Sequence, residues 1–210
     1  MSLRRATPRL LLAAAAALLI LSPARAPGTV AEQRARLPPP AECASPVEGV
    51  WKALVWSAGL GSWYEFTLEI HREPGSDTGL TGAIRVHGFE GSPDRPEPGP
   101  CVGLRFRGTM NARGWFRGGV VHFEGLDWHL DEVICGEWDT SYNVDTFEGK
   151  IDPRLQEFQS IHNDGHMAVD EATVFRRISC FEEKPRADVA MTPPPYYPER
   201  HGGCSCSVGL

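Results

Sequence analysis

The sequence predicts an all-β protein, an antiparallel up-and-down β-barrel of about eight strands stabilised by disulfides. Three observations point to this fold. Apolar residues recur at every second position in several segments, and turn-forming Gly, Pro, Asn and Asp residues separate these segments. The region between the chain ends has no convincing helical period. A β-sandwich built from the same strands is the alternative.

The clearest strand is predicted at residues 62–72, where apolar residues at even positions alternate with polar ones. Residues 73–79 contain Pro and Gly and form a turn, and residues 80–86 alternate again as the return strand. The remaining strands are predicted at residues 102–107, 120–123, 133–135, 144–151, 155–162 and 167–178. Asn163-Asp164-Gly165 is typical of a short hairpin turn, and Asp152-Pro153 marks another turn.

The N-terminal residues 1–26 have the three parts of a secretory signal peptide. A positive region contains Arg4, Arg5 and Arg9, an apolar run follows at residues 10–21, and Ala24-Arg25-Ala26 offers small residues at the cleavage positions. The apolar run is shorter than the ~20 residues that a membrane-spanning helix needs. We therefore expect a protein that is secreted or resides in the cell envelope, with no integral membrane span.

Composition divides the chain into four parts. We expect a signal peptide at 1–26, a Pro-rich linker at 27–42, the barrel domain at 43–181 and a Pro-rich, disordered, Cys-containing tail at 182–210. The signal peptide holds four of the 21 basic residues and none of the 27 acidic ones, so its removal leaves a net charge of −10. Such an acidic chain is a poor partner for nucleic acids or anionic membranes.

The cysteines are expected to form disulfides, because an exported chain reaches an oxidising compartment. Two of the six cysteines lie in the C-terminal tail, which leaves four for the domain. The first and last strands of a closed barrel pair, and Cys43 precedes the first predicted strand while Cys180 follows the last. We therefore expect a Cys43–Cys180 bridge and, by elimination, a Cys101–Cys135 bridge.

The tail motif Gly203-Cys204-Ser205-Cys206-Ser207 resembles the start of a bacterial cysteine-containing surface-sorting tag, which a Pro-rich spacer precedes. Such tags continue into an apolar helix and a basic run, whereas this sequence stops at Leu210. We expect surface attachment through a processed or vestigial tail. Redox exchange, soft-metal binding and intermolecular crosslinking through these cysteines are the alternatives.

Gly49-Val50-Trp51 in the first strand resembles the Gly-x-Trp pattern of calycins, the lipocalin and avidin type of ligand-binding barrels. Residues 61–66 and 80–82 also look like the avidin-type strand order. The resemblance covers the first three strands and the last one, and no biotin-site residue is carried over. It implies a β-barrel with its function in the interior or mouth.

In calycins an arginine on the last strand packs over the first-strand tryptophan. Arg176 alternates with Val174 and Ile178, so the resemblance implies that Arg176 packs over Trp51 at the barrel closure. The alternative is that these two are ordinary core and surface residues of a β domain.

The resemblance implies a secreted or envelope binding module that holds a small apolar ligand. Six apolar residues on alternating strand positions would line or fill the barrel: Tyr64, Phe66, Leu68, Leu104, Phe106 and Phe147. Core packing is the more common role of such residues. A non-catalytic surface or structural protein with a filled barrel is therefore the alternative function, and a metal-dependent enzyme is the third.

The candidates for metal binding or catalysis are few, and we assign no catalytic residue and no cofactor. His162 and His166 would face each other across a three-residue loop and could hold a metal, whereas a two-residue Asp164-Gly165 loop would separate them. Asp127 begins a second polar cluster that continues to Glu132. The sequence contains no nucleophile elbow, zinc-protease motif, phosphate-binding loop or dinucleotide fingerprint.

Overall fold

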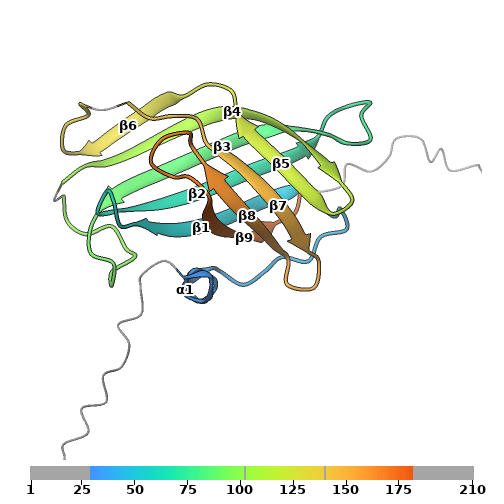
Figure 1. Ribbon diagram of the computed structural model, residues 1–210, viewed down its shortest axis with the longest axis horizontal. Coiled ribbons are helices and arrows are strands. Elements are labelled where there is room, and N and C mark those ends of the chain that lie inside the picture. The colour runs from blue at the N-terminus through green and yellow to red at the C-terminus, as the bar shows by residue number, and fades with distance from the viewer. Residues whose placement is uncertain (1–28, 102, 140, 182–210) are drawn as a thin grey trace, which may run out of the picture.

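The computed structural model describes residues 29–101, 103–139 and 141–181. The predicted signal peptide and the C-terminal tail motif lie outside this part of the chain. Within it, one helix and nine strands follow in the order α1 (Val30–Arg36), β1 (Gly49–Ser57), β2 (Ser62–Arg72), β3 (Gly79–Glu90), β4 (Arg105–Arg117), β5 (Val120–Gly125), β6 (His129–Cys135), β7 (Thr146–Asp152), β8 (Glu157–Asn163) and β9 (Glu171–Ser179) (Figure 1).

Eight of the strands close into an antiparallel barrel, which confirms the predicted fold class. The order around the barrel is β1-β2-β3-β4-β5-β7-β8-β9, and β9 pairs with β1 to complete the circle. The ninth strand, β6, pairs with the first half of β4, and β5 pairs with its second half. In Figure 1, β6 lies at the outer margin of the sheet.

The strands form where alternation places apolar residues inside the barrel. In β2, Phe66, Leu68 and Ile70 are buried, while Thr67 and Glu69 between them are partly exposed. The turn after β7 forms because the Asp152 carboxylate accepts hydrogen bonds from the next backbone N–H groups. This is the local chemistry that makes Asp a turn residue.

Aromatic and apolar side chains fill one end of the barrel. Trp51 is fully buried, and its indole Nε1 donates a hydrogen bond to the carbonyl of Val47 at 2.9 Å. Its ring meets Phe158 edge-on with 6.4 Å between centroids, and Phe158 stacks with Phe175 at 5.6 Å. A well-packed end of this kind leaves no room for a ligand.

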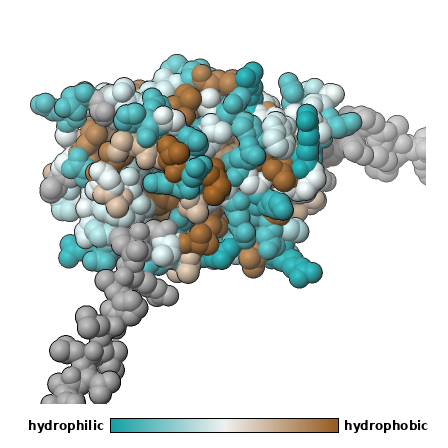
Figure 2. Space-filling model, viewed as in Figure 1, coloured by the Kyte–Doolittle hydropathy of each residue, from teal (hydrophilic) through white to brown (hydrophobic). Residues whose placement is uncertain are grey.

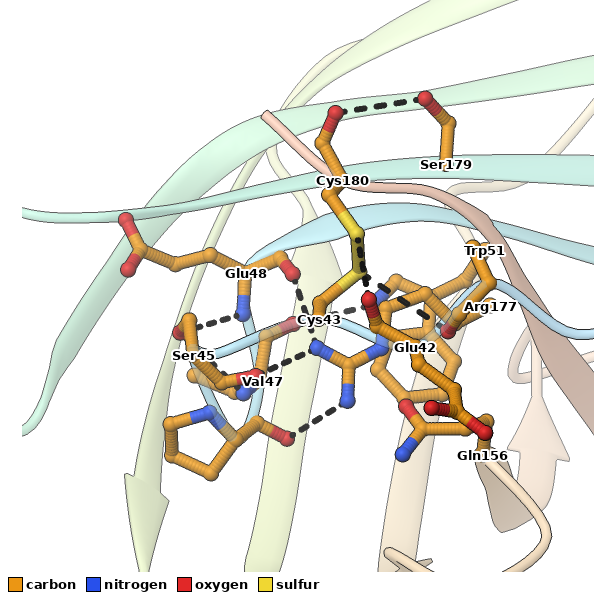
Figure 3. Close-up of a disulfide and its surroundings, with 12 residues drawn as sticks. Glu42, Cys43, Ser45, Val47, Glu48, Trp51, Gln156, Arg177, Ser179 and Cys180 are labelled. Atoms are coloured by element: carbon orange, nitrogen blue, oxygen red, sulfur yellow. Dashed lines mark hydrogen bonds between the residues drawn. A yellow bond between two sulfur atoms is a disulfide. The ribbon is translucent and has the colours of Figure 1, made fainter. Parts of the chain in front are cut away.

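The arginine over Trp51 is Arg177, so the prediction of Arg176 is wrong. The Arg177 guanidinium lies 4.7 Å from the Trp51 ring centroid, and the side chain is 1% exposed. It donates hydrogen bonds to the carbonyls of Ser45, Pro46 and Glu48 (Figure 3). An arginine–tryptophan contact at the barrel closure is therefore present, one residue further along the strand than expected.

The physical reason is that β9 is buried on both faces, so alternation alone does not say which face is inside. Phe175 and Arg177 point into the barrel, whereas Val174 is buried on the outside beneath α1. Arg176 also faces outward, and its Nη2 donates to the Glu157 carboxylate at 2.8 Å. The orientation of Arg176 was inferred from Val174, which is buried but faces outward, and the inference therefore chose the wrong face of β9.

The predicted linker at 27–42 contains an ordered helix. Thr29 and Glu32 form a capping box at the start of α1, which gives this short helix a defined N-terminus. The Gln33 amide is 2% exposed; it donates to the Ala172 carbonyl and accepts from the Val174 N–H, both at 2.8 Å. β1 and β9 pair only around residues 50–52 of β1. Gln33 therefore supplies hydrogen-bond partners to backbone groups of β9 that do not pair with β1.

Both expected disulfides are present. Cys43–Cys180 joins the segments before β1 and after β9 across a sequence separation of 137 residues, and Cys101–Cys135 ties the β3–β4 connection to the end of β6. Figure 3 shows the first bridge next to Arg177.

Hydrophobic and hydrophilic residues are interspersed on the face shown in Figure 2. In the described part of the chain, no helix has the length and apolar character needed to cross a membrane.

Candidate functional site

A cavity of about 380 Å³ occupies the barrel end that lies away from the Cys43–Cys180 bridge. Its walls come from the last residues of β1, β3 and β8 and from the first residues of β2, β4 and β9. The connection between β6 and β7 and the loop between β8 and β9 complete it. The barrel is thus filled at one end and hollow at the other.

Four of the six residues predicted to line or fill the barrel border this cavity: Tyr64, Phe66, Leu104 and Phe106. The other two, Leu68 and Phe147, are fully buried in the core cluster and do not line the cavity. All but Leu104 lie on strands and point into the barrel, as alternation predicts. Alternation does not specify how deep along the barrel axis a residue lies, and depth separates the two groups.

One wall of the cavity is aromatic. The centroids of Phe106 and Trp138 are 4.7 Å apart, those of Phe106 and Tyr142 are 5.9 Å apart, and those of Tyr64 and Tyr142 are 6.4 Å apart. Trp138 and Tyr142 belong to the β6–β7 connection, which sequence analysis did not single out. Trp128 stacks behind Tyr142 at 4.3 Å and supports this wall.

A buried hydrogen-bonded trio lies next to the aromatic wall. The His162 Nε2 atom is 2.7 Å from Asp145 Oδ1, and the Tyr142 hydroxyl donates to Asp145 Oδ2 at 3.1 Å. Asp145 is fully buried, and His162 is 4% exposed. Sequence analysis noticed His162 but missed Asp145, whose only signal was a charged residue at the second position of the strand predicted at 144–151.

Burial and negative charge shift the pKa values of this group. Burial raises the pKa of Asp145, although the hydrogen bond from His162 opposes the shift. Burial, followed by the charge of Asp145, raises the pKa of Tyr142 well above its ordinary value. The pKa of Tyr64 rises to about 12 through burial and then through Asp145, Asp164 and Glu90. Both phenols therefore stay protonated at neutral pH.

His162 has one ring nitrogen in use and one without a partner. Its Nε2 atom contacts Asp145, while its buried Nδ1 atom has no hydrogen-bond partner among the described residues. The ring stacks on Phe147 with 4.7 Å between centroids and meets Phe66 at 5.2 Å. Because buried polar atoms are generally satisfied, an unpaired ring nitrogen beside a cavity is a candidate contact for a bound molecule.

The loop between β8 and β9 is wider than either hairpin considered from the sequence. His162 pairs with Glu171, and Asp164 Oδ1 accepts hydrogen bonds from the backbone N–H groups of His166 and Ala168. These bonds organise a loop over residues 164–170. Both of the short turns considered from the sequence are therefore wrong. The strand predicted from residue 167 consequently begins at Glu171.

His162 and His166, the predicted metal ligands, both line the cavity. The Nε2 atom of His162 already contacts Asp145 at 2.7 Å. Within residues 29–101, 103–139 and 141–181, no group of three or more His, Cys, Asp or Glu side chains is arranged to hold a metal ion. Metal binding by the two histidines would therefore need further ligands.

The polar cluster that begins at Asp127 lies outside the cavity. Asp127 is exposed and accepts hydrogen bonds from the backbone and side chain of Asn111, which lower its pKa. Asp131 accepts a hydrogen bond from Thr109 on the same exposed surface. These carboxylates do not converge in a pocket, as a shared acid–base site would require.

Fold and cavity define the class of protein: a closed antiparallel β-barrel with a partly hollow interior, compatible with the calycin resemblance. Comparisons with family models, with curated proteins and with solved structures gave no significant match.

Proposed function

We propose that this protein is an exported binding module that holds a small molecule with an apolar body in the hollow half of a calycin-like barrel. The observation that carries the proposal is the cavity of about 380 Å³ at one end of a barrel whose other end is packed. Small-molecule sites typically have volumes of roughly 300–1,000 Å³ and predominantly apolar walls with a few polar groups. This cavity fits that description.

The exposed residues at the rim indicate that the cavity is open to solvent. Leu60 and Met167 line the cavity and remain 44% and 46% exposed, so apolar side chains stand at its solvent-facing rim. The two disulfides support an oxidising compartment and therefore export.

A metal-dependent enzyme has less support. The two predicted metal ligands, His162 and His166, both line the cavity, but the enzyme candidate Asp127 lies outside it. Attachment to a cell surface through the C-terminal tail remains a proposal that rests on the sequence motif alone.

Native mass spectrometry of the purified mature protein, followed by titration with the neutral dye Nile red, tests the binding function. We expect a retained small molecule or saturable dye binding. Ser57→Trp places a large side chain in the cavity and should weaken dye binding about tenfold or more, since the added indole would occupy part of the site. Thr67→Trp adds the same side chain on the outer face of β2 and should leave binding unchanged.

Absence of both a retained molecule and saturable dye binding would overturn the binding module. Equal dye affinities of the native protein and Ser57→Trp would place the dye outside the cavity. Circular dichroism of both variants shows whether the barrel is intact.

A further inference from the structure

We infer that the cavity selects an organic cation, a protonated amine with an apolar body, over neutral or anionic molecules of the same shape. This inference rests on the proposed binding function and names the ligand class of the same site.

The charged residues that line the cavity are acidic. Glu90 at the end of β3, Asp164 in the β8–β9 loop and Glu171 at the start of β9 border it, and none of the described lining residues is Lys or Arg. Buried Asp145 adds a carboxylate behind His162. A cleft lined by one sign of charge concentrates ligands of the opposite sign, and low-dielectric walls strengthen the effect.

The aromatic wall supplies a second, independent attraction for a cation. Tyr64, Phe106, Trp138 and Tyr142 form a contiguous group of rings along the cavity. The face of an aromatic ring carries partial negative charge and attracts an ammonium group, most strongly where water is excluded. Aromatic rings combined with carboxylates therefore favour an amine with an apolar body over a purely hydrophobic molecule.

His162 supplies an acceptor suited to a protonated amine. While Asp145 is ionised it can only accept hydrogen bonds, so His162 Nε2 carries the proton and Nδ1 presents a lone pair. That Nδ1 atom is buried and has no partner among the described residues, and His162 lines the cavity, so a bound molecule is a candidate partner for it. A protonated amine brings N–H donors, whereas a carboxylate ligand brings none.

The raised pKa of the Tyr64 phenol agrees with a negative potential in the cavity. Burial is the main reason that the pKa of this phenol rises to about 12, and the charges of Asp145, Asp164 and Glu90 add to the rise. The same charges that disfavour a phenolate at this wall favour a cation beside it.

Three probes that share a phenethyl body test the inference: phenethylamine, phenethyl alcohol and hydrocinnamate, which are cationic, neutral and anionic. Isothermal titration calorimetry is done at mildly alkaline pH, where histidine side chains are generally neutral and primary amines are charged. We expect phenethylamine to bind about tenfold or more tightly than phenethyl alcohol, and hydrocinnamate to bind most weakly.

Charge-neutralising variants assign the preference to the cavity. Glu90→Gln and Glu171→Gln should each weaken phenethylamine binding about two- to fivefold, as expected for partly solvated charge pairs, and leave phenethyl alcohol binding unchanged. Glu148→Gln is the matched control, because Glu148 lies on the outer face of β7 beside His122. It should not alter the affinity for any probe.

The outcomes separate this inference from the proposed function. If phenethyl alcohol or hydrocinnamate binds as tightly as phenethylamine, the cation preference is overturned and the binding module stands. If none of the three binds a protein that binds Nile red, the cation preference is again overturned. If neither the dye nor any probe binds, both proposals fail.

Discussion

Arg177 combines two kinds of interaction in one buried side chain. Its guanidinium packs on Trp51 and donates hydrogen bonds to the backbone carbonyls of Ser45, Pro46 and Glu48, and these contacts fix the segment that leads into β1. Burial lowers its pKa, yet an arginine stays charged throughout the physiological range. The hydrogen bonds offset the cost of burying this charge, so removing the side chain leaves several carbonyls without partners.

We expect Arg177→Ala to lower the free energy of unfolding by about 3 kcal/mol, since a buried hydrogen-bond network and the packing on Trp51 are lost together. Urea unfolding followed by tryptophan fluorescence measures the change. Arg177→Lys keeps the charge but loses the planar donor fork, so it should recover only part of the stability. Arg85→Ala on the outer face of β3 is the control and should change stability by less than about 0.5 kcal/mol. A loss under about 1 kcal/mol in Arg177→Ala would contradict this role.

At the same scale, sequence patterns identified the type of contact better than the residue that makes it. The resemblance implied an arginine over Trp51, and the structure places Arg177 there. The roles of His162 and Asp145 depend on each other across the β7–β8 pair and the connection before it. No local pattern predicts such a contact, because its two members lie on different elements.

Among the elements, α1 was not predicted, because the sequence analysis assigned residues 27–42 to a linker. It lies outside the barrel against β1 and β9 (Figure 1), and its Gln33 side chain occupies backbone groups of β9 that β1 leaves free. Arg34 adds an ion pair to the buried Glu157 at 2.8 Å. A short helix of this length is marginal alone and depends on such tertiary contacts.

Gln33→Ala should destabilise the junction between β1 and β9, which is the seam of the barrel. We expect faster hydrogen exchange of the Val174 amide and a loss of about 1–2 kcal/mol in stability, because two buried backbone groups lose their partners. Amide exchange measured by NMR locates the effect. Gln159→Ala, at an exposed position of β8, provides the comparison and should leave the Val174 exchange rate as it is. Unchanged exchange in Gln33→Ala would show that α1 does not protect the seam.

At the scale of the whole molecule, the two disulfides lie at different places in the barrel. Cys43–Cys180 spans 137 residues and connects the two ends of the barrel circle, whereas Cys101–Cys135 spans 34 residues beside the hollow end. In the chain-entropy account, a bridge that closes a longer loop restricts the unfolded chain more. The closure bridge should therefore contribute more to stability.

Replacing Cys43 and Cys180 by Ser should lower the free energy of unfolding by roughly 4–5 kcal/mol, and replacing Cys101 and Cys135 should cost about 1 kcal/mol less, since the second loop is shorter. Denaturant unfolding of both double variants under identical conditions gives the comparison. A larger loss for the Cys101 and Cys135 pair would show that native-state contacts, rather than loop length, determine their contributions.

Local sequence patterns predicted the all-β class and most of the strands, and the two cysteine pairings followed from the expectation that the first and last strands of a barrel meet. Alternation and turn residues act over a few neighbours, so the bounds of β2 at residues 62–72 could be predicted from them. They specify which residues share a face of a strand. They say nothing about what covers that face.

Only the tertiary structure decided which end of the barrel is hollow, which arginine meets Trp51, and that Asp145 holds His162. Each of these depends on depth along the barrel axis or on contacts between residues distant in sequence. A period of two repeats identically along a strand and carries neither kind of information. The cavity exists because the packed side chains end partway along the barrel, a property of the closed sheet as a whole.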